Sequence, residues 1–234
     1  MRRIAILKTG STRLTQTVAR RGGDYESWFA ETLVPLGVQV EVLDAVGGEL
    51  PDRNDWDGVV ITGSPASVHH REPWSEAAGR WIARRVAKGM PTLGVCYGHQ
   101  LLADALGGDT GPSHTPELGL YDVELLAEDP LFTDLPSPWP SFEIHYDEVT
   151  QLPRDAKLLA RSPRCAVQAF GIANHVRAVQ WHPEFDAFGV REAIDQDADN
   201  LRRIGMDPTE LRDRVEEQPL ATKILENFIK EFVR

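Results

Sequence analysis

About the first hundred residues alternate between short apolar runs and segments whose apolar side chains recur every three or four positions. The apolar runs predict buried strands, and the longer spacing predicts helices with one face on a core. The predicted strands are residues 2–10, 38–46, 57–63 and 92–96, and the predicted helices are residues 24–37, 75–89 and 98–108. Ser75 is expected to cap the second of these helices and Gly89 to end it.

Repeated alternation of strands and helices, with glycines at the strand ends, predicts a parallel sheet that helices cover on both faces. In such sheets, ligands bind beyond the carboxyl ends of the strands. Gly63 and Cys96 each end a predicted strand. Both residues are therefore expected at the ligand-binding edge.

After about Gly119 the pattern predicts strands joined by turns and a more antiparallel arrangement. The strands predicted in this part are residues 118–127, 156–162, 165–171 and 176–185. Asp207 followed by Pro208 is a helix start signal, and the apolar face of residues 221–234 is expected to lie on the sheet.

The fold class that these elements predict is α/β, a three-layer sandwich with a central, mostly parallel mixed sheet and helices on both faces. No internal repeat and no long linker divides the chain, so we expect a single domain over residues 1–234. Its C-terminal segment is expected to be helical from about residue 186.

Charge and composition limit the kinds of partner that the chain is expected to bind. The 234 residues carry 36 acidic and 25 basic side chains, a formal net charge of −11, which argues against nucleic acid and anionic membranes. A small-molecule substrate or another protein is the expected partner. The two cysteines form no disulfide framework and lack metal-ligand spacing, and we find no secretion signal and no apolar run of about 20 residues. The sequence thus predicts a cytoplasmic protein with reduced thiols, no metal site and no cofactor.

Cys96 lies in the sequence Gly94-Val95-Cys96-Tyr97-Gly98, between a predicted strand and a predicted helix. A strand that turns at once into a helix needs small residues on both sides of the turn, and such an elbow exposes a nucleophile. The turn also aims the amide of Tyr97 and the positive end of the helix at the sulfur. The alternative for Cys96 is a buried structural cysteine between packing glycines. Cys165 has no such glycines beside it, and we interpret it as a structural cysteine.

A thiolate nucleophile works best beside a histidine that a third group holds in place. His182 and Glu184 are two positions apart at the end of a predicted strand, so their side chains leave the chain on the same side. Glu184 is then able to fix the tautomer of His182 while the other imidazole nitrogen faces Cys96. These three residues are our candidate catalytic triad.

The joint pattern of "GVCYGHQ" and "HPE", with "VVITGSPASV" before them, resembles the class I, triad-type glutamine amidotransferases, such as the glutaminase domain of GMP synthetase. The resemblance implies a flavodoxin-like fold and hydrolysis of a γ-glutamyl amide through a thioester. It implies that Cys96 is the nucleophile, His182 the general base and acid and Glu184 its orienter. It places the oxyanion hole at the amides of Ser64 and Tyr97. The expected substrate contacts are Gly63, Gln100, His145 and Tyr146.

Two positions depart from the family pattern. Ser64 replaces the second glycine of the common Gly-Gly-Pro and is expected to be strained if that position requires a positive φ. Ile144 and Tyr146 replace the serine and glycine of a Ser-His-Gly-Asp stretch that supplies contacts to glutamine. The resulting His145-Tyr146-Asp147-Glu148-Val149 is similar to stand-alone γ-glutamyl peptidases.

The leading hypothesis is therefore a cysteine hydrolase that acts on the γ-carbonyl of glutamine or of a γ-glutamyl compound. One alternative is a glutaminase subunit that supplies ammonia to a separate synthetase chain. Another is a catalytically silent relative that binds a ligand or partner. Apolar positions in residues 188–205 are able to meet a partner helix, but we favour a covering role at this domain's own sheet edge or active-site rim.

Overall fold

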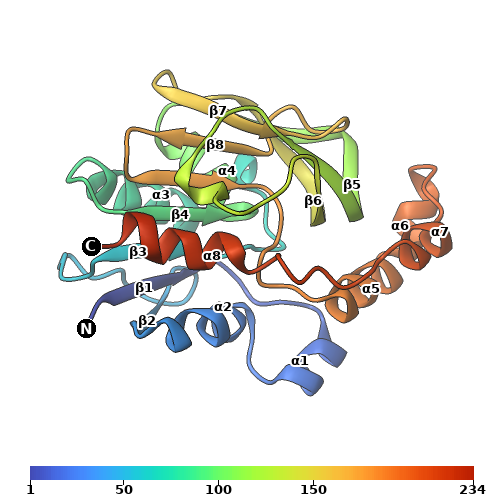
Figure 1. Ribbon diagram of the computed structural model, residues 1–234, viewed down its shortest axis with the longest axis horizontal. Coiled ribbons are helices and arrows are strands. Elements are labelled where there is room, and N and C mark those ends of the chain that lie inside the picture. The colour runs from blue at the N-terminus through green and yellow to red at the C-terminus, as the bar shows by residue number, and fades with distance from the viewer.

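A nine-stranded mixed sheet forms the centre of the protein, for which a computed structural model describes residues 1–234 (Figure 1). Its strands are β1 (Arg3–Lys8), β2 (Gln39–Asp44), β3 (Gly58–Ile61), β4 (Thr92–Val95), β5 (Asp109–Leu125), β6 (Trp139–Gln151), β7 (Ala156–Arg161), β8 (Ala169–Ile172) and β9 (Val176–Val179). The order across the sheet is β2-β1-β3-β4-β9-β8-β7-β5-β6.

The sheet has a parallel half and an antiparallel half. Strands β2, β1, β3, β4 and β9 are all paired in parallel, and every pairing from β9 through β8, β7 and β5 to β6 is antiparallel. The predicted mixed sheet and α/β class are confirmed. Strands β5 and β6 form a long hairpin that joins β7 only through Glu124 and Leu125.

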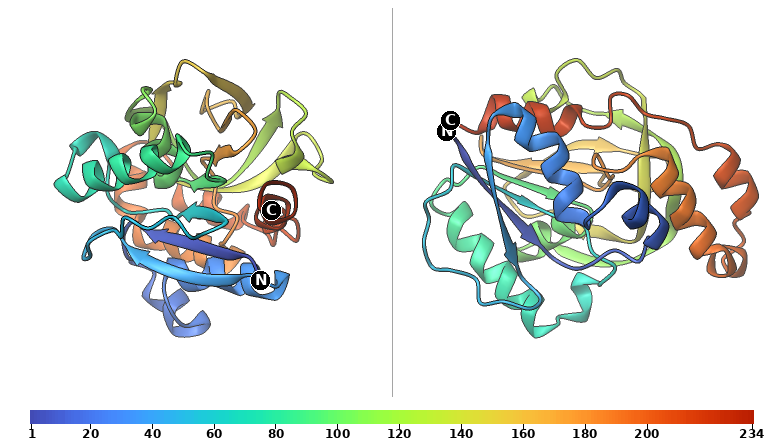
Figure 2. Two further views of the ribbon diagram at one scale, coloured as in Figure 1. Left: turned by 90° about the vertical axis from the view of Figure 1, so that its left-hand side faces the viewer. Right: turned by 90° about the horizontal axis from the view of Figure 1, so that it is seen from below.

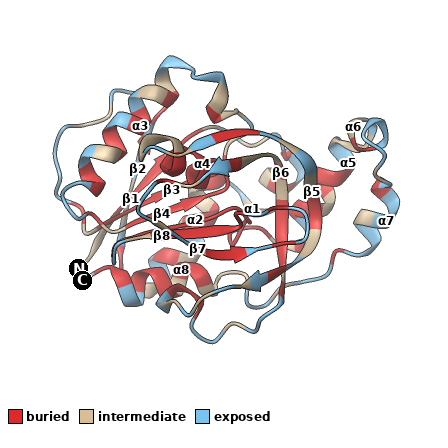
Figure 3. Cartoon of the chain, turned by 90° about the horizontal axis from the view of Figure 1, so that it is seen from above, coloured by how far each residue is buried: buried red, intermediate tan, exposed pale blue.

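Helices cover both faces of the sheet, as the strand patterns require. Ile4 and Ile6 of β1 pack in one core with α2 (Tyr25–Leu33) and α8 (Lys223–Asn227). The alternate residues, Ala5 and Leu7, pack in a second core; its helices are α3 (Pro73–Val86) and α4 (Tyr97–Ala105). This period of two is that of a strand buried on both faces, and Figure 3 shows the central strands buried throughout.

The apolar C-terminal face lies on the sheet as predicted. Its residues Ile224, Leu225, Phe228, Ile229, Phe232 and Val233 all belong to the first core. A π-helical turn, Phe228–Phe232, continues α8. Short 3-10 turns occur at Val34–Leu36, Val68–His70 and Pro130–Phe132. No helix has both the length and the apolar character that crossing a membrane requires.

Four further helices gather at one end of the molecule. They are α1 (Thr15–Arg21), α5 (Ala187–Gln196), α6 (Ala198–Arg203) and α7 (Pro208–Asp213). Figures 1 and 2 show α1 beside α5, with α6 and α7 beyond. Val190, Ile194 and Leu201 are fully buried in a third core with residues of β5 and β6. Val190, Ile194 and Leu201 thus cover this domain's own rim, which is the role we favoured, whereas Phe188 and Ile204 are exposed.

One predicted helix start is wrong, one is confirmed, and one helix was not predicted. Ser75 does not cap α3, because the helix begins at Pro73 after Glu72, and the Ser75 hydroxyl instead lies 2.5 Å from that of Tyr97. Asp207 does cap α7, accepting a hydrogen bond from the amide of Thr209. The pattern gave no sign of α1, whose only buried residue is Thr17.

Candidate active site

Cys96 forms a sharp turn at the carboxyl end of β4. Its backbone has φ 51° and ψ −104°, a left-handed φ that non-glycine residues seldom adopt, and α4 starts at the next residue. The Cys96 amide still donates to the carbonyl of Val179 in β9, at 2.9 Å. The strand therefore remains paired up to the residue whose side chain leaves the sheet, which is the geometry of a nucleophile elbow.

Gly94 and Gly98, on either side of Cys96, are required because the backbone of α4 packs closely against β3 and β4. A Cβ on Gly94 would lie 2.4 Å from the carbonyl oxygen of Gly98, and a Cβ on Gly98 would lie 2.6 Å from that of Ile61. Real Cβ atoms do not come this close to backbone oxygens, so α4 reaches β3 and β4 only without side chains there. The reason given from sequence for the two glycines agrees with these contacts.

His182 and Glu184 lie together after β9. The His182 amide donates to the carbonyl of Phe142 at 2.8 Å, which fixes the residue against β6. Its Nδ1 lies 2.7 Å from Oε1 of Glu184, and both side chains are buried. The ring of Phe185 stacks on the imidazole with centroids 4.5 Å apart. The hydrogen bond of its amide, the Glu184 carboxylate and the stacked Phe185 ring together hold the side chain of His182 in one orientation.

Charge determines the protonation of His182. Burial acts to lower its pKa, but the Glu184 carboxylate and then the Cys96 sulfur raise it, and the net result is a pKa well above the usual value. The imidazolium form is thus stabilised between two groups that carry negative charge when ionised. Such a histidine is suited to protonate a departing amine.

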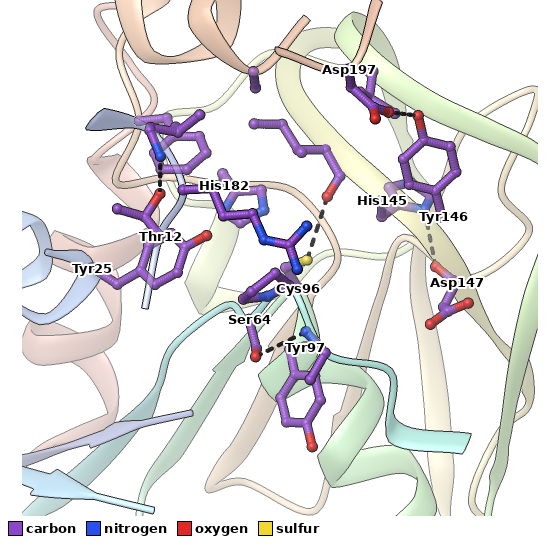
Figure 4. A pocket seen from close by; sticks show the side chains of 18 of the residues that line it. Thr12, Tyr25, Ser64, Cys96, Tyr97, His145, Tyr146, Asp147, His182 and Asp197 are labelled. Carbon is purple, nitrogen blue, oxygen red and sulfur yellow. Dashed lines mark hydrogen bonds between the residues drawn. The ribbon is translucent and has the colours of Figure 1, made fainter. Parts of the chain in front are cut away.

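Gly63 has no side chain, and the imidazole of His182 occupies the space beside it. A Cβ at this position would lie 2.9 Å from Cε1 of His182 and 3.7 Å from Cβ of Cys96. The carboxyl ends of β3, β4 and β9 thus bring Gly63, Cys96 and His182 to one point, as Figure 4 shows for the cysteine and the histidine.

Ser64 and Tyr97, the predicted oxyanion-hole residues, both line the cavity in front of Cys96. Tyr97 is the first residue of α4, where backbone amides have no partner within the helix. Its ring points away and stacks on Trp74. Ser64 has no positive φ, so the strain considered for this serine is absent, and its Oγ accepts from the amide of Ala66 at 3.2 Å.

Gln100 is buried and lines the same cavity. Its Nε2 donates to the carbonyl of Asp147 and to Oε1 of Gln180. That Gln180 oxygen also lies 3.1 Å from Nδ1 of His99. Burial lowers the pKa of His99 to about 3, so this histidine is neutral and faces the interior.

His145 and Tyr146 of β6 line the cavity but are held by protein groups. Nε2 of His145 lies 3.0 Å from Oε2 of Glu117, and its Nδ1 lies 3.1 Å from the carbonyl of Asp147. The Tyr146 hydroxyl donates to the carboxylate of Asp197. Just before them in β6, the carbonyl of Ile144 lies 3.7 Å from the Cys96 sulfur. Strand β6 therefore forms one wall of the cavity with its backbone as well as its side chains.

One buried cluster has side chains that metals also use. Glu117, His145 and Cys165 offer ligand atoms within 4.8 Å of one another. The sequence spacing had suggested no metal site. Protein groups engage this cluster: Gln168 and Ser162 donate to Glu117, and His145 bonds to the same carboxylate. Burial raises the pKa of Cys165, which keeps it in the thiol form.

The cavity has a volume of about 300 Å³. Much of its lining was missed from sequence, and most of these residues belong to α1, to α5 or to the segments next to them. The missed lining residues are Thr12, Arg13, Leu14, Tyr25, Phe185, Ala193, Gln196 and Asp197. The available signal was the segment after the glycine that ends the first predicted strand, since that segment also starts at the carboxyl edge.

Comparison with known proteins gives a family and several relatives for this chain. A model of the family described as "Glutamine amidotransferase class-I" matches residues 21–189. A glutamine-hydrolyzing GMP synthase of Aeropyrum pernix is 42% identical over 168 residues, which are 70% of this chain and 31% of that protein. The chain thus spans about a third of that relative.

A second relative is shorter, and a solved structure shows the same fold. Gamma-glutamyl peptidase 3 of Arabidopsis thaliana is 28% identical over 192 residues, 78% of this chain and 77% of that one. The crystal structure of a glutamine amido transferase from Methylobacillus flagellatus superposes with a TM-score of 0.81 and 23% identity, covering 100% of this chain and 96% of that chain.

Proposed function

The chain belongs to the class-I glutamine amidotransferase family, and on this basis we propose that it is a cysteine hydrolase of γ-glutamyl amide bonds. The proposed nucleophile is Cys96, with His182 as general acid and base and Glu184 as the group that orients His182. The observation that carries the proposal is the meeting of a strained cysteine elbow with a buried His182–Glu184 pair at the carboxyl edge of the sheet.

The reaction has two halves. The Cys96 sulfur forms a bond to the γ-carbonyl carbon, the bond from that carbon to nitrogen breaks, and His182 gives its proton to the departing amine. Water then attacks the thioester, His182 takes one proton from the water, and the bond from carbon to sulfur breaks as the proton returns to the thiolate. The products are glutamate and the free amine.

The amides of Ser64 and Tyr97 are proposed to hold the oxyanion in both halves. A single donor of this kind is typically worth about 2.7–4 kcal/mol of barrier lowering. Of the substrate contacts proposed at Gly63, Gln100, His145 and Tyr146, the last three line one cavity and Gly63 lies beside His182 and Cys96, which supports this assignment. The thiol must stay reduced, so the proposal includes a reducing compartment such as the cytoplasm.

Glutamate release from γ-glutamyl peptides and from glutamine tests the proposal. We expect turnover with the unaltered chain and none with Cys96→Ala, while Cys165→Ala, the matched control at the other cysteine, remains active. Circular dichroism and melting temperature verify that both variants fold. Turnover by folded Cys96→Ala would refute the role of Cys96.

A second candidate is a glutaminase subunit that passes ammonia to a separate synthetase chain. The identity to the Aeropyrum GMP synthase, of which this chain covers 31%, favours it. Against it, α5 supplies part of the cavity wall, so a partner would have to reach the sulfur past this helix. Hydrolysis of γ-glutamyl peptides in preference to glutamine supports the stand-alone hydrolase, and the reverse preference supports the subunit.

A further inference from the structure

Arg13 is the only arginine or lysine among the residues that line the cavity. Its guanidinium takes part in none of the hydrogen bonds or ion pairs of the chain, although other arginines at this rim are paired. Arg20 pairs with Asp186, and Arg21 pairs with Glu31. An unpaired cation in a concave site is available to bind an anion.

The backbone on both sides of Arg13 is held in place. Asp24 accepts from the amide of Thr12 at 2.9 Å, and Leu14 is buried in the third core. The carbonyl of Arg13 itself accepts from Nε2 of Gln196 at 2.9 Å. The guanidinium is therefore presented from a fixed backbone, and binding a ligand needs little further ordering of the chain.

Helix α5 strengthens this arrangement. The carboxylate of Glu192 accepts from the amides of Gln16 and Thr17 at 2.8 and 2.7 Å, so it caps the first turn of α1. Gln196 lies one turn further along α5 and also donates to Glu192. One face of α5 thus fixes both α1 and the segment that carries Arg13.

The segment that carries Arg13 lies on the same side of Cys96 as His182. Its neighbour Thr12 is close to Tyr25, the ring of Tyr25 stacks on Phe185, and Phe185 stacks on His182. Figure 4 shows Thr12 and Tyr25 on this side, with Tyr146 and Asp147 on the opposite side of the sulfur. The amine that leaves during hydrolysis must depart past its proton donor, His182, and therefore toward Arg13.

We propose that Arg13 binds a carboxylate on the leaving amine, and thereby selects γ-glutamyl amino acids or peptides that end in a free carboxylate. The inference rests on the hydrolase function proposed above. A guanidinium pairs with a carboxylate through two parallel hydrogen bonds. Ammonia, the leaving group of glutamine, offers nothing for Arg13 to bind.

A pair of substrates isolates this contact. γ-Glutamylglycine and γ-glutamylglycinamide differ at the end of the leaving amine, which is a carboxylate in the first and a neutral carboxamide in the second. A change in the ratio of their kcat/KM values between variants therefore reports recognition of the carboxylate. We expect the acid to be preferred by the unaltered chain, and Arg13→Gln to lower the ratio by at least about tenfold. Arg13→Lys should retain part of the preference.

The matched control is Arg202→Gln. Arg202 lies on α6 with its side chain 62% exposed, and its replacement changes the net charge equally without touching the cavity. An unchanged ratio in Arg13→Gln would overturn the inference, even if turnover fell equally with both substrates. Arg13 would then not discriminate between the two leaving groups. If the unaltered chain releases glutamate from neither compound but does so from glutamine, the inference fails while the hydrolase proposal stands. If it releases glutamate from none of the three, the hydrolase proposal itself fails.

Discussion

Nδ1 of His182 lies 2.7 Å from Oε1 of Glu184, and both residues are almost completely removed from solvent. Because the environment is buried, this carboxylate is the strongest of the influences that raise the pKa of His182. It also leaves the opposite ring nitrogen free for the sulfur and the leaving group. The protonation and the orientation of His182 thus depend on one residue, which makes the pair open to experiment.

Glu184→Gln should lower kcat/KM by roughly 10²- to 10⁴-fold, as expected for loss of the orienting carboxylate. It should also change the pH profile. The folded-state pKa of His182 is raised above its ordinary value near 6.5, so the imidazolium persists below that raised pKa and is lost as pH rises through it. Without the carboxylate, the alkaline limb of kcat/KM should move to lower pH.

The pH dependence of kcat/KM for the two proteins checks this prediction. The same linkage applies to stability: the contribution of protonated His182 is complete below the unfolded pKa and is lost as pH rises through the folded one. An alkaline limb at the same pH in both proteins would show that Glu184 does not set the protonation of His182.

Gly63→Ala should reduce turnover about a hundredfold, because the added Cβ would lie 2.9 Å from the imidazole and displace it from Cys96. The stability loss should stay within the roughly 1–3 kcal/mol of overpacking. Gly79→Ala is the control, since a Cβ there meets ordinary contacts at 3.5 Å or more in the interior of α3. Kinetics and denaturant unfolding of both variants measure the effects; full activity in Gly63→Ala would mean that the imidazole is not confined as described.

Glu192→Ala should destabilise the protein by about 2 kcal/mol, because the amide of Gln16 and the buried amide and hydroxyl of Thr17 lose their acceptor. Amide exchange should rise over residues 12–21. On the same helix, Asp195 is exposed and pairs with Arg212 at the surface, so Asp195→Ala should cost less than about 0.5 kcal/mol. Equal losses in the two variants would argue against a capping role for Glu192.

The two cysteines should differ in reactivity. Cys96 lines the cavity, whereas Cys165 is buried in the interior with its pKa raised by that burial, so little thiolate is available there. Brief treatment of the native protein with iodoacetamide near neutral pH should modify Cys96 and spare Cys165, as measured by peptide mass spectrometry. In denaturant both should react, and preferential modification of Cys165 in the native state would contradict the placement of the two thiols.

The sequence predicted the parts of this structure that local rules control. The strands before Gly63 and Cys96 are short apolar runs, and the glycines at 94 and 98 have local steric reasons, so the elbow was foreseeable. The predicted start of α3 was wrong. The helix begins with Pro73, and the Ser75 hydroxyl forms a hydrogen bond with the hydroxyl of Tyr97, which is far away in the sequence.

The cavity walls depend on contacts between distant segments and were not foreseeable in the same way. Arg13 and Gln196 are far apart in sequence, and contacts between α5 and the segment of α1, such as the capping of α1 by Glu192, bring them together. The start of β5 was also missed, since Pro112 and a register shift interrupt its strand pattern. The part of the site that is proposed to contact the leaving group was therefore the least predictable part.

The central claim is that Cys96 carries the γ-glutamyl group during turnover. The most direct test is to quench a reaction with a γ-glutamyl peptide in acid and measure the intact mass and the peptide map. We predict one γ-glutamyl group per chain, attached as a thioester at Cys96 and absent from Cys96→Ala. Product formation without any acyl-enzyme at Cys96, or acylation at another residue, would contradict the account.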